Sequence, residues 1–383
     1  MSHAEPLVFD AHVDSLQKSL DLGQDLGLEG PGHLDLERAA AGGLGSVVFV
    51  CWCHPSHIEK GPHGARDRTR GLLGEFHRLI ARHPERVRFA GNGAALRAAH
   101  AAGCVGGIPG IEGGHSIEES LEQLEWFFER GVRVMGLVWN NHLSWIRSCQ
   151  PGAGANVPAG MNAFGREVVR RMNELGMLVD LSHAGERSFY DALEAGAQPA
   201  IASHSGCKSL HDHPRNLTDE QLRELARHGG VVGIVFYPTF LSAEAQAEDV
   251  RLRKSEAYRS LCVGLGETEA WLRRSEWLQR EARPLDADVV IDHICHAVEI
   301  AGVDHVGLGS DYDGIERAPR GLEHAGCYGL IAERLRARGF HGADVAKILG
   351  GNMQRVFERA TAQGTRAWEA ELQPLAWPGR VEG

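Results

Sequence analysis

His12 and Asp14 stand at the end of an apolar segment, in the sequence Leu7-Val8-Phe9-Asp10-Ala11-His12-Val13-Asp14. Side chains at positions i and i+2 of a β-strand point to the same side, so this segment would present an imidazole and a carboxylate together. Nitrogen and oxygen donors of this kind bind zinc and similar divalent ions. The segment therefore predicts one half of a metal site at the end of a strand.

Three further potential ligands follow apolar segments in the same way. Glu112 lies in Gly110-Ile111-Glu112-Gly113-Gly114, and His183 and His204 each come directly after an apolar run. With His12 and Asp14 they make five ligands, more than one tetrahedral zinc needs. Two metal ions roughly 3.5–4 Å apart and bridged by one carboxylate would use the whole set, and such pairs activate a shared water and polarise a carbonyl. We interpret Glu112 as the bridging carboxylate.

Two aspartates follow the last predicted strand, in Gly307-Leu308-Gly309-Ser310-Asp311-Tyr312-Asp313-Gly314. Asp311 is the best candidate for the carboxylate that takes a proton from the attacking hydroxide and passes it to the leaving amine. Asp313 precedes a glycine, and we interpret it as a turn residue.

Arg215 lies in His213-Pro214-Arg215-Asn216-Leu217, just before a helix whose Thr218 and Gln221 form a capping box. The proline and the cap would hold this loop still. The guanidinium could bind a carboxylate through two hydrogen bonds or form an ordinary surface salt bridge, and its immediate sequence leaves both open.

Helical and apolar extended segments alternate along the chain. Eight strands are predicted, at 7–11, 46–52, 105–111, 132–139, 177–181, 200–203, 231–236 and 305–309. Eight strands separated by helices indicate a closed (β/α)8 TIM barrel, in which the working residues lie at the carboxyl ends of the strands. We expect one metallo-dependent hydrolase barrel domain over 1–383. It would carry a helical insertion at 238–285, after strand seven, that could act as a lid, and a C-terminal extension at 363–383.

Composition limits the partners and the compartment. The chain has 383 residues, 43% of them hydrophobic, and a net charge of −11 with both signs mixed along it, which argues against nucleic acids and anionic membranes as partners. A cleaved signal peptide would remove His12 and Asp14, so we expect a cytoplasmic protein. The eight cysteines contain no Cys-x-x-Cys pair, which favours buried free thiols over disulfides or a zinc-thiolate site.

These segments together resemble the membrane dipeptidase (renal dipeptidase) family of zinc peptidases, peptidase family M19, a branch of the amidohydrolase-like barrels. The resemblance runs over nearly the whole chain. It is carried by the segments at 9–14, 38–45, 110–113, 164–169, 176–183, 203–205, 214–217, 309–314 and 350–357.

The resemblance implies a binuclear zinc dipeptidase (two Zn2+ per chain) in which a hydroxide bridging the metals attacks the peptide carbonyl. It implies the following roles: His12 and Asp14 hold one zinc, His183 and His204 hold the other, Glu112 bridges them, Asp311 handles protons and Arg215 binds the C-terminal carboxylate of the dipeptide. It also implies tolerance for a D-residue at the C-terminal position.

One position departs from the family pattern. Mammalian members carry a histidine after strand four, where this sequence has Trp139, followed by Asn140, Asn141 and His142. We expect Trp139, Asn140 and His142 to contact the substrate there. Two other functions remain open: hydrolysis of a cyclic amide, lactone or phosphoester at the same metals, or a catalytically silent barrel that binds a peptide-like ligand. A homodimer also remains open.

Overall fold

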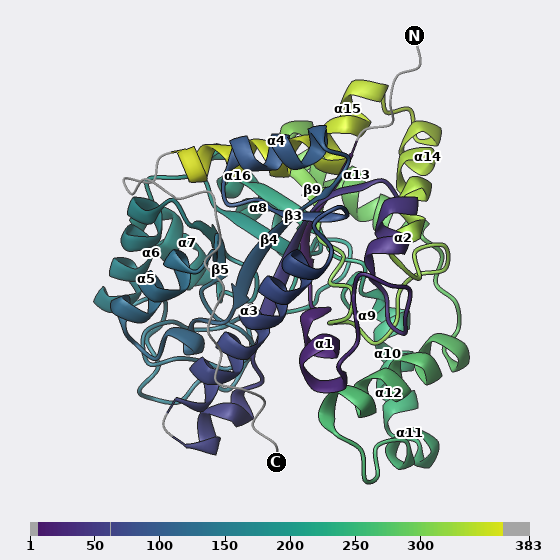
Figure 1. Cartoon of the computed structure of the whole chain (residues 1–383), viewed down its shortest axis with the longest axis horizontal. Helices are drawn as coiled ribbons and strands as arrows, with labels where there is room; N and C mark the ends of the chain where they lie inside the picture. The colour runs from purple at the N-terminus through teal and green to yellow at the C-terminus, as the bar shows by residue number, and fades with distance from the viewer. Residues whose placement is uncertain (1–6, 62, 363–383) are drawn as a thin grey trace.

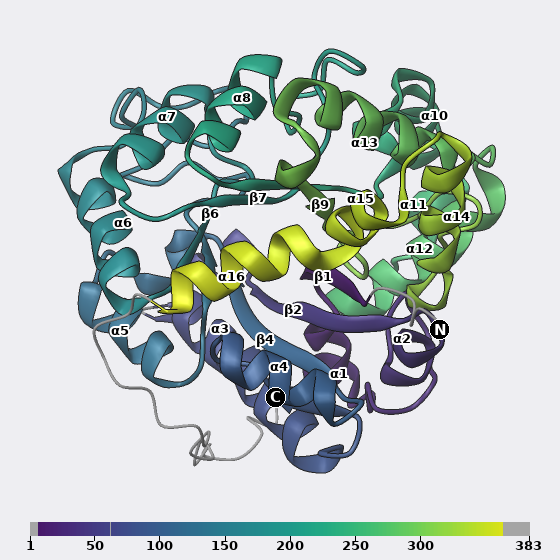
Figure 2. The ribbon, with the colours of Figure 1, turned by 90° about the horizontal axis from the view of Figure 1, so that it is seen from above.

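The computed structural model describes residues 7–61 and 63–362 and contains a closed parallel barrel of eight strands (Figure 2). The barrel strands are β1 (Val8–Val13), β2 (Leu44–Trp52), β4 (Val105–Glu112), β5 (Val134–Gly136), β6 (Leu178–Asp180), β7 (Ile201–Ser205), β8 (Val231–Ile234) and β9 (Val306–Leu308). β1 pairs with β2 on one side and with β9 on the other. β2 also pairs with β4, and this pairing closes the sheet into a barrel. The predicted (β/α)8 TIM barrel is confirmed.

A ninth strand, β3 (Val87–Phe89), was not predicted. It pairs with the first part of β4, at Val105 to Gly107, while β5 pairs with the last part of β4, at Gly110 to Glu112. β3 therefore extends the sheet only at the amino end of the barrel, away from the predicted ligands.

Helices surround the barrel (Figure 2). Outside the insertion the α-helices are α1 (Leu16–Leu22), α2 (Leu36–Ala41), α3 (Gly64–Arg82), α4 (Gly93–Ala101), α5 (Leu121–Glu129), α6 (Ala163–Leu175), α7 (Glu186–Ala195), α8 (Asp219–Arg227), α13 (Asp288–Ala301), α14 (Gly329–Ala337), α15 (Gly342–Ala346) and α16 (Asn352–Ala362). Short 3-10 turns occur at Pro55–Lys60, Gly114–Ile117, Val303–His305 and Ala325–Cys327, and a π turn at Lys347–Gly351. The capping box of Thr218 and Gln221 is present at the start of α8.

The amino end of the barrel is closed by α16, which crosses it (Figures 1 and 2). Apolar residues of this helix, including Met353 and Phe357, form one buried cluster with Phe9, Val48 and Ile108 from the strands. Burial of this apolar surface stabilises the closed barrel. The other end of the barrel is left for the polar site.

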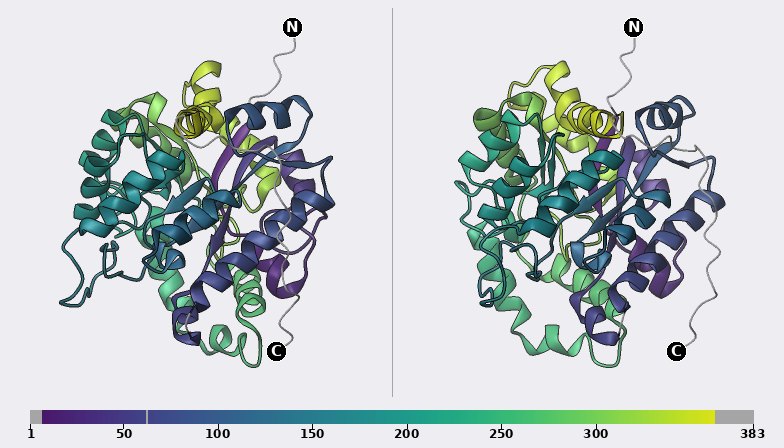
Figure 3. Two further views of the ribbon diagram at one scale, coloured as in Figure 1. Left: turned by 60° about the vertical axis from the view of Figure 1, so that its left-hand side comes forward. Right: turned by 90° about the vertical axis from the view of Figure 1, so that its left-hand side faces the viewer.

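The segment after β8, the seventh barrel strand, forms the predicted helical insertion. Its helices are α9 (Pro238–Leu241), α10 (Ala243–Arg253), α11 (Glu256–Ser260) and α12 (Glu267–Glu281). The insertion lies at the end of the molecule opposite α16 in both views of Figure 3. It is fixed to the segment that follows β9, since the buried Arg317 and Asp249 side chains pair at 2.8 Å and the Ser275 hydroxyl donates to the Glu316 carbonyl at 2.8 Å. The insertion therefore packs against the carboxyl end of the barrel and forms part of the wall there.

Three remaining expectations concern the rest of the chain. The predicted C-terminal extension at 363–383 lies outside the described residues. All eight cysteines are free thiols, as expected, but only four of them are buried: Cys51, Cys53, Cys104 and Cys207. Within 7–61 and 63–362, none of the helices combines the length and the apolar character needed to cross a bilayer.

Candidate metal centre

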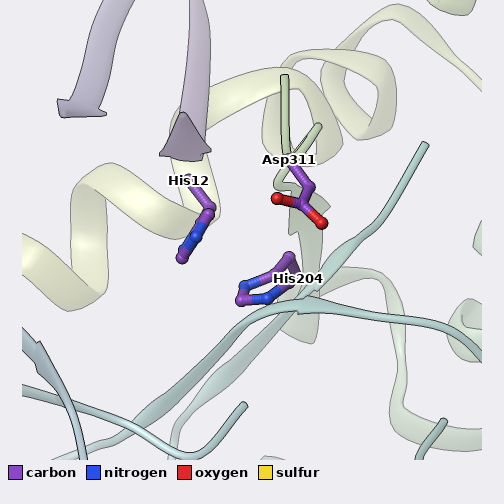
Figure 4. A group of neighbouring side chains, drawn as sticks. All are labelled: His12, His204 and Asp311. Carbon is purple, nitrogen blue, oxygen red and sulfur yellow. The ribbon is translucent and has the colours of Figure 1, made fainter. Parts of the chain in front are cut away.

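The five predicted ligands and Asp311 meet at the carboxyl end of the barrel. Their donor atoms fall into three overlapping sets, each with all atoms within 4.8 Å of one another: His12, Asp14 and Glu112; Glu112, His183 and His204; and His12, His204 and Asp311. Figure 4 shows His12, His204 and Asp311 converging on one space from separate strand ends. The structure thus brings together side chains that are up to 299 positions apart in the sequence.

Glu112 belongs to two of these sets because its two carboxylate oxygens face different histidines. Oε1 lies 2.8 Å from Nε2 of His183 and 3.4 Å from Nε2 of His204, and Oε2 lies 3.7 Å from Nε2 of His12. A carboxylate oriented in this way can bind one cation through each oxygen. The arrangement fits the bridging position expected for Glu112.

The donor atoms fit a metal. Nε2 of His12 and Oδ1 of Asp14 are buried and have no hydrogen-bond partner among the described residues. Buried polar atoms are normally paired, so two ligand atoms of one potential metal group that lack hydrogen bonds fit coordination of a cation. Nε2 of His183 also lies 3.1 Å from Nε2 of His204, a separation that suits either a shared proton or a cation coordinated by both rings. The mixed nitrogen and oxygen set suits zinc or a similar ion.

Ser203, which carries no distinctive sequence signal, fixes the orientation of two of the histidines. Its hydroxyl donates to Oδ2 of Asp180 at 2.6 Å. The oxygen of that hydroxyl lies 2.8 Å from Nδ1 of His204 and 3.1 Å from Nδ1 of His12, so it accepts a hydrogen bond from each ring. With the proton on Nδ1 of both rings, Nε2 is left as the metal-binding atom.

Asn140 holds the third histidine in the same way. Its Oδ1 accepts a hydrogen bond from Nδ1 of His183 at 2.9 Å and another from Nε2 of Gln150 at 2.9 Å. The side chain that we expected to contact substrate is therefore engaged with a ligand histidine. The structure places His142 farther along this loop, where its Nδ1 accepts a hydrogen bond from the Ser148 amide at 3.2 Å.

Trp139 packs against His183, with ring centres 6.1 Å apart, and forms an edge contact with Trp52 at 5.1 Å. Both indoles line a cavity of about 550 Å3 together with Glu112 and His204. Trp139 therefore forms part of the wall that a substrate bound to the metals would meet.

Two site residues adopt left-handed backbone conformations. The φ angles of His183 and Asp311 are 67° and 62°. Such angles are uncommon for residues with side chains and are concentrated at functional sites, where the surrounding fold imposes them. Here the Asp311 amide donates to the carbonyl of His12 at 3.0 Å, which ties the strained residue to β1.

The buried charged groups of the site shift one another's pKa values. Burial disfavours the charge on Glu112, but the neighbouring His12 outweighs it and holds the pKa of Glu112 well below its usual range. Burial lowers the pKa of His12, but Glu112 and Asp14 outweigh it and raise that pKa well above its usual value. The proton that these carboxylates favour on His12 occupies the place that a metal cation would take.

The pKa values of His183, His204 and Asp311 are also shifted, in directions that suit a metal centre. Burial, reinforced by the charge of Arg215, lowers the pKa of His183 to about 4 and that of His204 well below its usual value. Both rings are therefore neutral and able to coordinate. Burial raises the pKa of Asp311 well above its usual range, and the negative charges of Asp14 and Glu112 add to the rise. A carboxyl group with a raised pKa suits proton exchange.

Arg215 is buried beside the site, with only 3% of its surface exposed. Its Nη2 donates to the carbonyl of His204 at 2.9 Å, and its guanidinium carbon lies 5.4 Å from the ring centre of Phe240. It lines a second cavity, of about 520 Å3, which shares His183 with the first. A surface salt bridge, the alternative that its local sequence left open, is therefore wrong.

Asp313 has the left-handed turn geometry expected of it, with φ of 66°, but it is also a buried ion-pair partner. Its Oδ2 lies 2.7 Å from Nζ of Lys18, and its Oδ1 accepts a hydrogen bond from the amide of His33 at 2.7 Å. The pair links the loop after β9 to α1. Lys18 gave no signal in the sequence, since nothing in its surroundings there marked it as buried.

Comparisons with known proteins identify the family of this chain. The family model described as Membrane dipeptidase (Peptidase family M19) matches residues 3–370. The uncharacterized dipeptidase C965.12 of Schizosaccharomyces pombe is 28% identical over 358 residues, which cover 91% of this chain and 77% of that protein.

Two crystal structures are similar over almost their whole length. The metallopeptidase dipeptidase AC has a TM-score of 0.76 and 25% identity, covering 93% of this chain and 99% of that one. A metallopeptidase from Rhodobacter sphaeroides, crystallised with a phosphinate mimic of the dipeptide L-Ala-D-Ala, has a TM-score of 0.75 and 25% identity, covering 93% of this chain and 100% of its own.

Proposed function

The chain belongs to the membrane dipeptidase family, peptidase family M19, and from that membership we propose that it is a dipeptidase dependent on two zinc ions. The observation that carries the proposal is the position of Glu112, whose two oxygens face separate sets of potential ligands. A single metal would not use both sets.

We assign the first ion to His12 and Asp14, the second to His183 and His204, and the shared position to Glu112. When bound, zinc ions would polarise the carbonyl of the peptide bond and lower the pKa of the attacking water. The chain itself supplies the orientation of the ligands, because Ser203 and Asn140 hold the Nδ1 atoms of the three histidines.

Asp311 is assigned the proton transfer. Its carboxylate lies within 4.8 Å of the donor atoms of His12 and His204, so it reaches the position where water would attack. It would accept the proton of that water and deliver it to the nitrogen of the leaving amine as the C–N bond breaks. Its raised pKa favours the step that takes up the proton.

Arg215 is assigned the C-terminal carboxylate of the dipeptide. Its Nε is buried and has no hydrogen-bond partner among the described residues, so the guanidinium retains a donor for a ligand. The relative from Rhodobacter sphaeroides was crystallised with a mimic of L-Ala-D-Ala, and we extend to this chain a tolerance for a D-residue at the C-terminal position.

Metal analysis paired with a dipeptide panel tests this proposal. The purified protein should contain two zinc ions per chain and hydrolyse dipeptides with L- or D-residues at the second position, with activity lost on chelation and restored by zinc. Cyclic amides and lactones form the comparison set, because Arg215 lines the neighbouring cavity and such substrates have no carboxylate for it. If only the cyclic amides and lactones are hydrolysed, the alternative function, hydrolysis of such cyclic substrates at the same metals, replaces the dipeptidase assignment.

A further inference from the structure

Two arginines of the insertion line the same cavity as the metal ligands. Arg253 ends α10 and Arg274 lies in α12, and both border the 550 Å3 space together with Glu112 and His204. Neither belongs to the metal centre. They bring positive charge to the wall that the insertion adds to the barrel.

Both guanidiniums are held in place. Each has its central carbon 5.9 Å from the ring centre of Tyr258, and each forms an ion pair with Glu316, at 3.5 Å for Nε of Arg274. The Tyr258 hydroxyl donates to the same Glu316 carboxylate at 2.8 Å, and Nη2 of Arg253 donates to the hydroxyl of Tyr237 at 2.6 Å. Tyr258 and Glu316 are buried, so the pair is organised before any ligand arrives.

The cluster carries more positive than negative charge. Two guanidiniums share one carboxylate, and Nε of Arg274, which lies 3.5 Å from Glu316, makes no hydrogen bond among the described residues. Glu267, the other acidic residue on this wall, is exposed in the first turn of α12 and forms no ion pair with either arginine in the described part of the chain. The spare positive charge is therefore available to an anion in the cavity.

The position of Arg215 indicates which end of a dipeptide meets this wall. If Arg215 binds the C-terminal carboxylate, the C-terminal residue extends from the metals towards the second cavity, past His183. The N-terminal residue then lies in the first cavity, on the side of the insertion. A side chain from that residue would extend into the cavity that Arg253 and Arg274 help to line.

We propose that Arg253 and Arg274 form a subsite for a carboxylate on the N-terminal residue, so that the preferred substrates are dipeptides beginning with Glu or Asp. This inference rests on the proposed dipeptidase function. A purely structural role, in which the arginines only fasten the insertion through Glu316, is the competing explanation. The Arg317–Asp249 pair already provides a separate buried link to the same segment.

Matched substrates separate the two explanations. The zinc-loaded full chain should hydrolyse Glu-Ala with a kcat/KM about tenfold or more above that for Gln-Ala, since one charge-assisted contact has roughly this value. Arg253→Met and Arg274→Met should each reduce that ratio towards 1. Arg251→Met is the matched control, because Arg251 is 70% exposed on the same helix and pairs only with Glu248 among the described residues, and it should leave the ratio unchanged.

Binding measurements make the result independent of turnover. Phosphinate mimics of Glu-Ala and Gln-Ala are not hydrolysed, so calorimetric Kd values report the subsite even if no dipeptide is cleaved. The Glu mimic should bind about tenfold more tightly in the parent chain, and the preference should fall in both arginine variants. Equal Kd values, no binding of either mimic, or a preference that survives both substitutions would overturn the subsite. Absent hydrolysis with a preserved binding preference would instead overturn the dipeptidase assignment.

Discussion

The imidazole rings of His12 and His204 share one hydrogen-bond acceptor, the hydroxyl oxygen of Ser203, at 3.1 Å and 2.8 Å. Their ring centres are 3.8 Å apart, although the proposed function assigns them to different zinc ions. Because the same hydroxyl donates to Asp180, its orientation is fixed, and so is the proton position on both rings. Ser203 therefore orients one histidine of each proposed metal position.

Replacing Ser203 by alanine should weaken both metal positions together. Outer hydrogen-bond partners of metal ligands typically contribute 10–100-fold to metal affinity, so we expect zinc affinity to fall by about that factor at each position. Competition with a fluorescent chelator measures it. Ser205→Ala is the control, because Ser205 is buried in the same strand but its hydroxyl has no hydrogen-bond partner among the described residues. Loss at only one position would contradict the shared role.

Glu112→Gln should remove metal and activity together. The amide is a poor bridging ligand, and the substitution removes the negative charge next to three histidines. Zinc content per chain should fall below one, and turnover should drop by at least about 100-fold. Glu122→Gln, at an exposed position in the first turn of α5, should change neither. Full zinc occupancy with normal turnover in the Glu112 variant would remove the bridge assignment.

Arg215→Lys should act mainly on KM for dipeptides with a free C-terminal carboxylate. Lysine keeps the positive charge but cannot form the bidentate hydrogen bonds of a guanidinium with a carboxylate. We therefore expect KM to rise about tenfold while kcat changes little. C-terminally amidated dipeptides are the internal comparison, since they have no carboxylate to lose. Equal rises in KM for the free and amidated substrates would contradict the assigned contact.

The stability of the metal-free protein should fall as the pH drops from 6.5 to 4, in part because of His293. This side chain is 1% exposed, its Nδ1 accepts a hydrogen bond from the Cys207 amide, and its Nε2 donates to the Leu241 carbonyl. Burial lowers the pKa of His293 to about 4. In the unfolded chain His293 is protonated below about pH 6.5, whereas in the native chain it stays neutral until about pH 4. Proton binding therefore stabilises the unfolded state between these pH values.

His293→Gln removes this titration. The loss of unfolding free energy between pH 7 and pH 4 should be about 3 kcal/mol smaller in the variant than in the parent chain. Urea unfolding at several pH values, with a chelator present in both samples, provides the comparison. Parallel curves for the two proteins would show that His293 does not carry this dependence.

The main architecture and the ligand set could be predicted because both leave local signals. Apolar runs that end in His, Asp or Glu mark strand ends, and in a parallel barrel all carboxyl ends of strands meet at one rim. His12 and Glu112 were recognisable for that reason. β3 was not, because Val87-Arg88-Phe89 is a short segment with one exposed residue, and it pairs with only part of β4.

The supporting residues could not be predicted because their roles depend on distances across the fold. A serine within a strand has no distinctive pattern, so the link from Ser203 to His12, 191 positions away, appears only in three dimensions. Asn140, expected to contact substrate, lines the first cavity, but its hydrogen bond to His183 could not be read from its place in the chain. Asp313 was recognised as a turn residue, while its ion pair with Lys18 depends on a helix far away in the sequence.

The insertion is fastened through Arg317 and Asp249 to the segment that begins at Asp311, while the proposed metal ligands lie on the barrel strands and in the loops just after them. The insertion can therefore be altered separately from the barrel residues. If the proposed function holds, a mutant library confined to positions 238–285, with Asp249 kept, should vary the accepted peptides and leave the proposed zinc ligands untouched. Selectivity could then be evolved in the laboratory without rebuilding the reactive core.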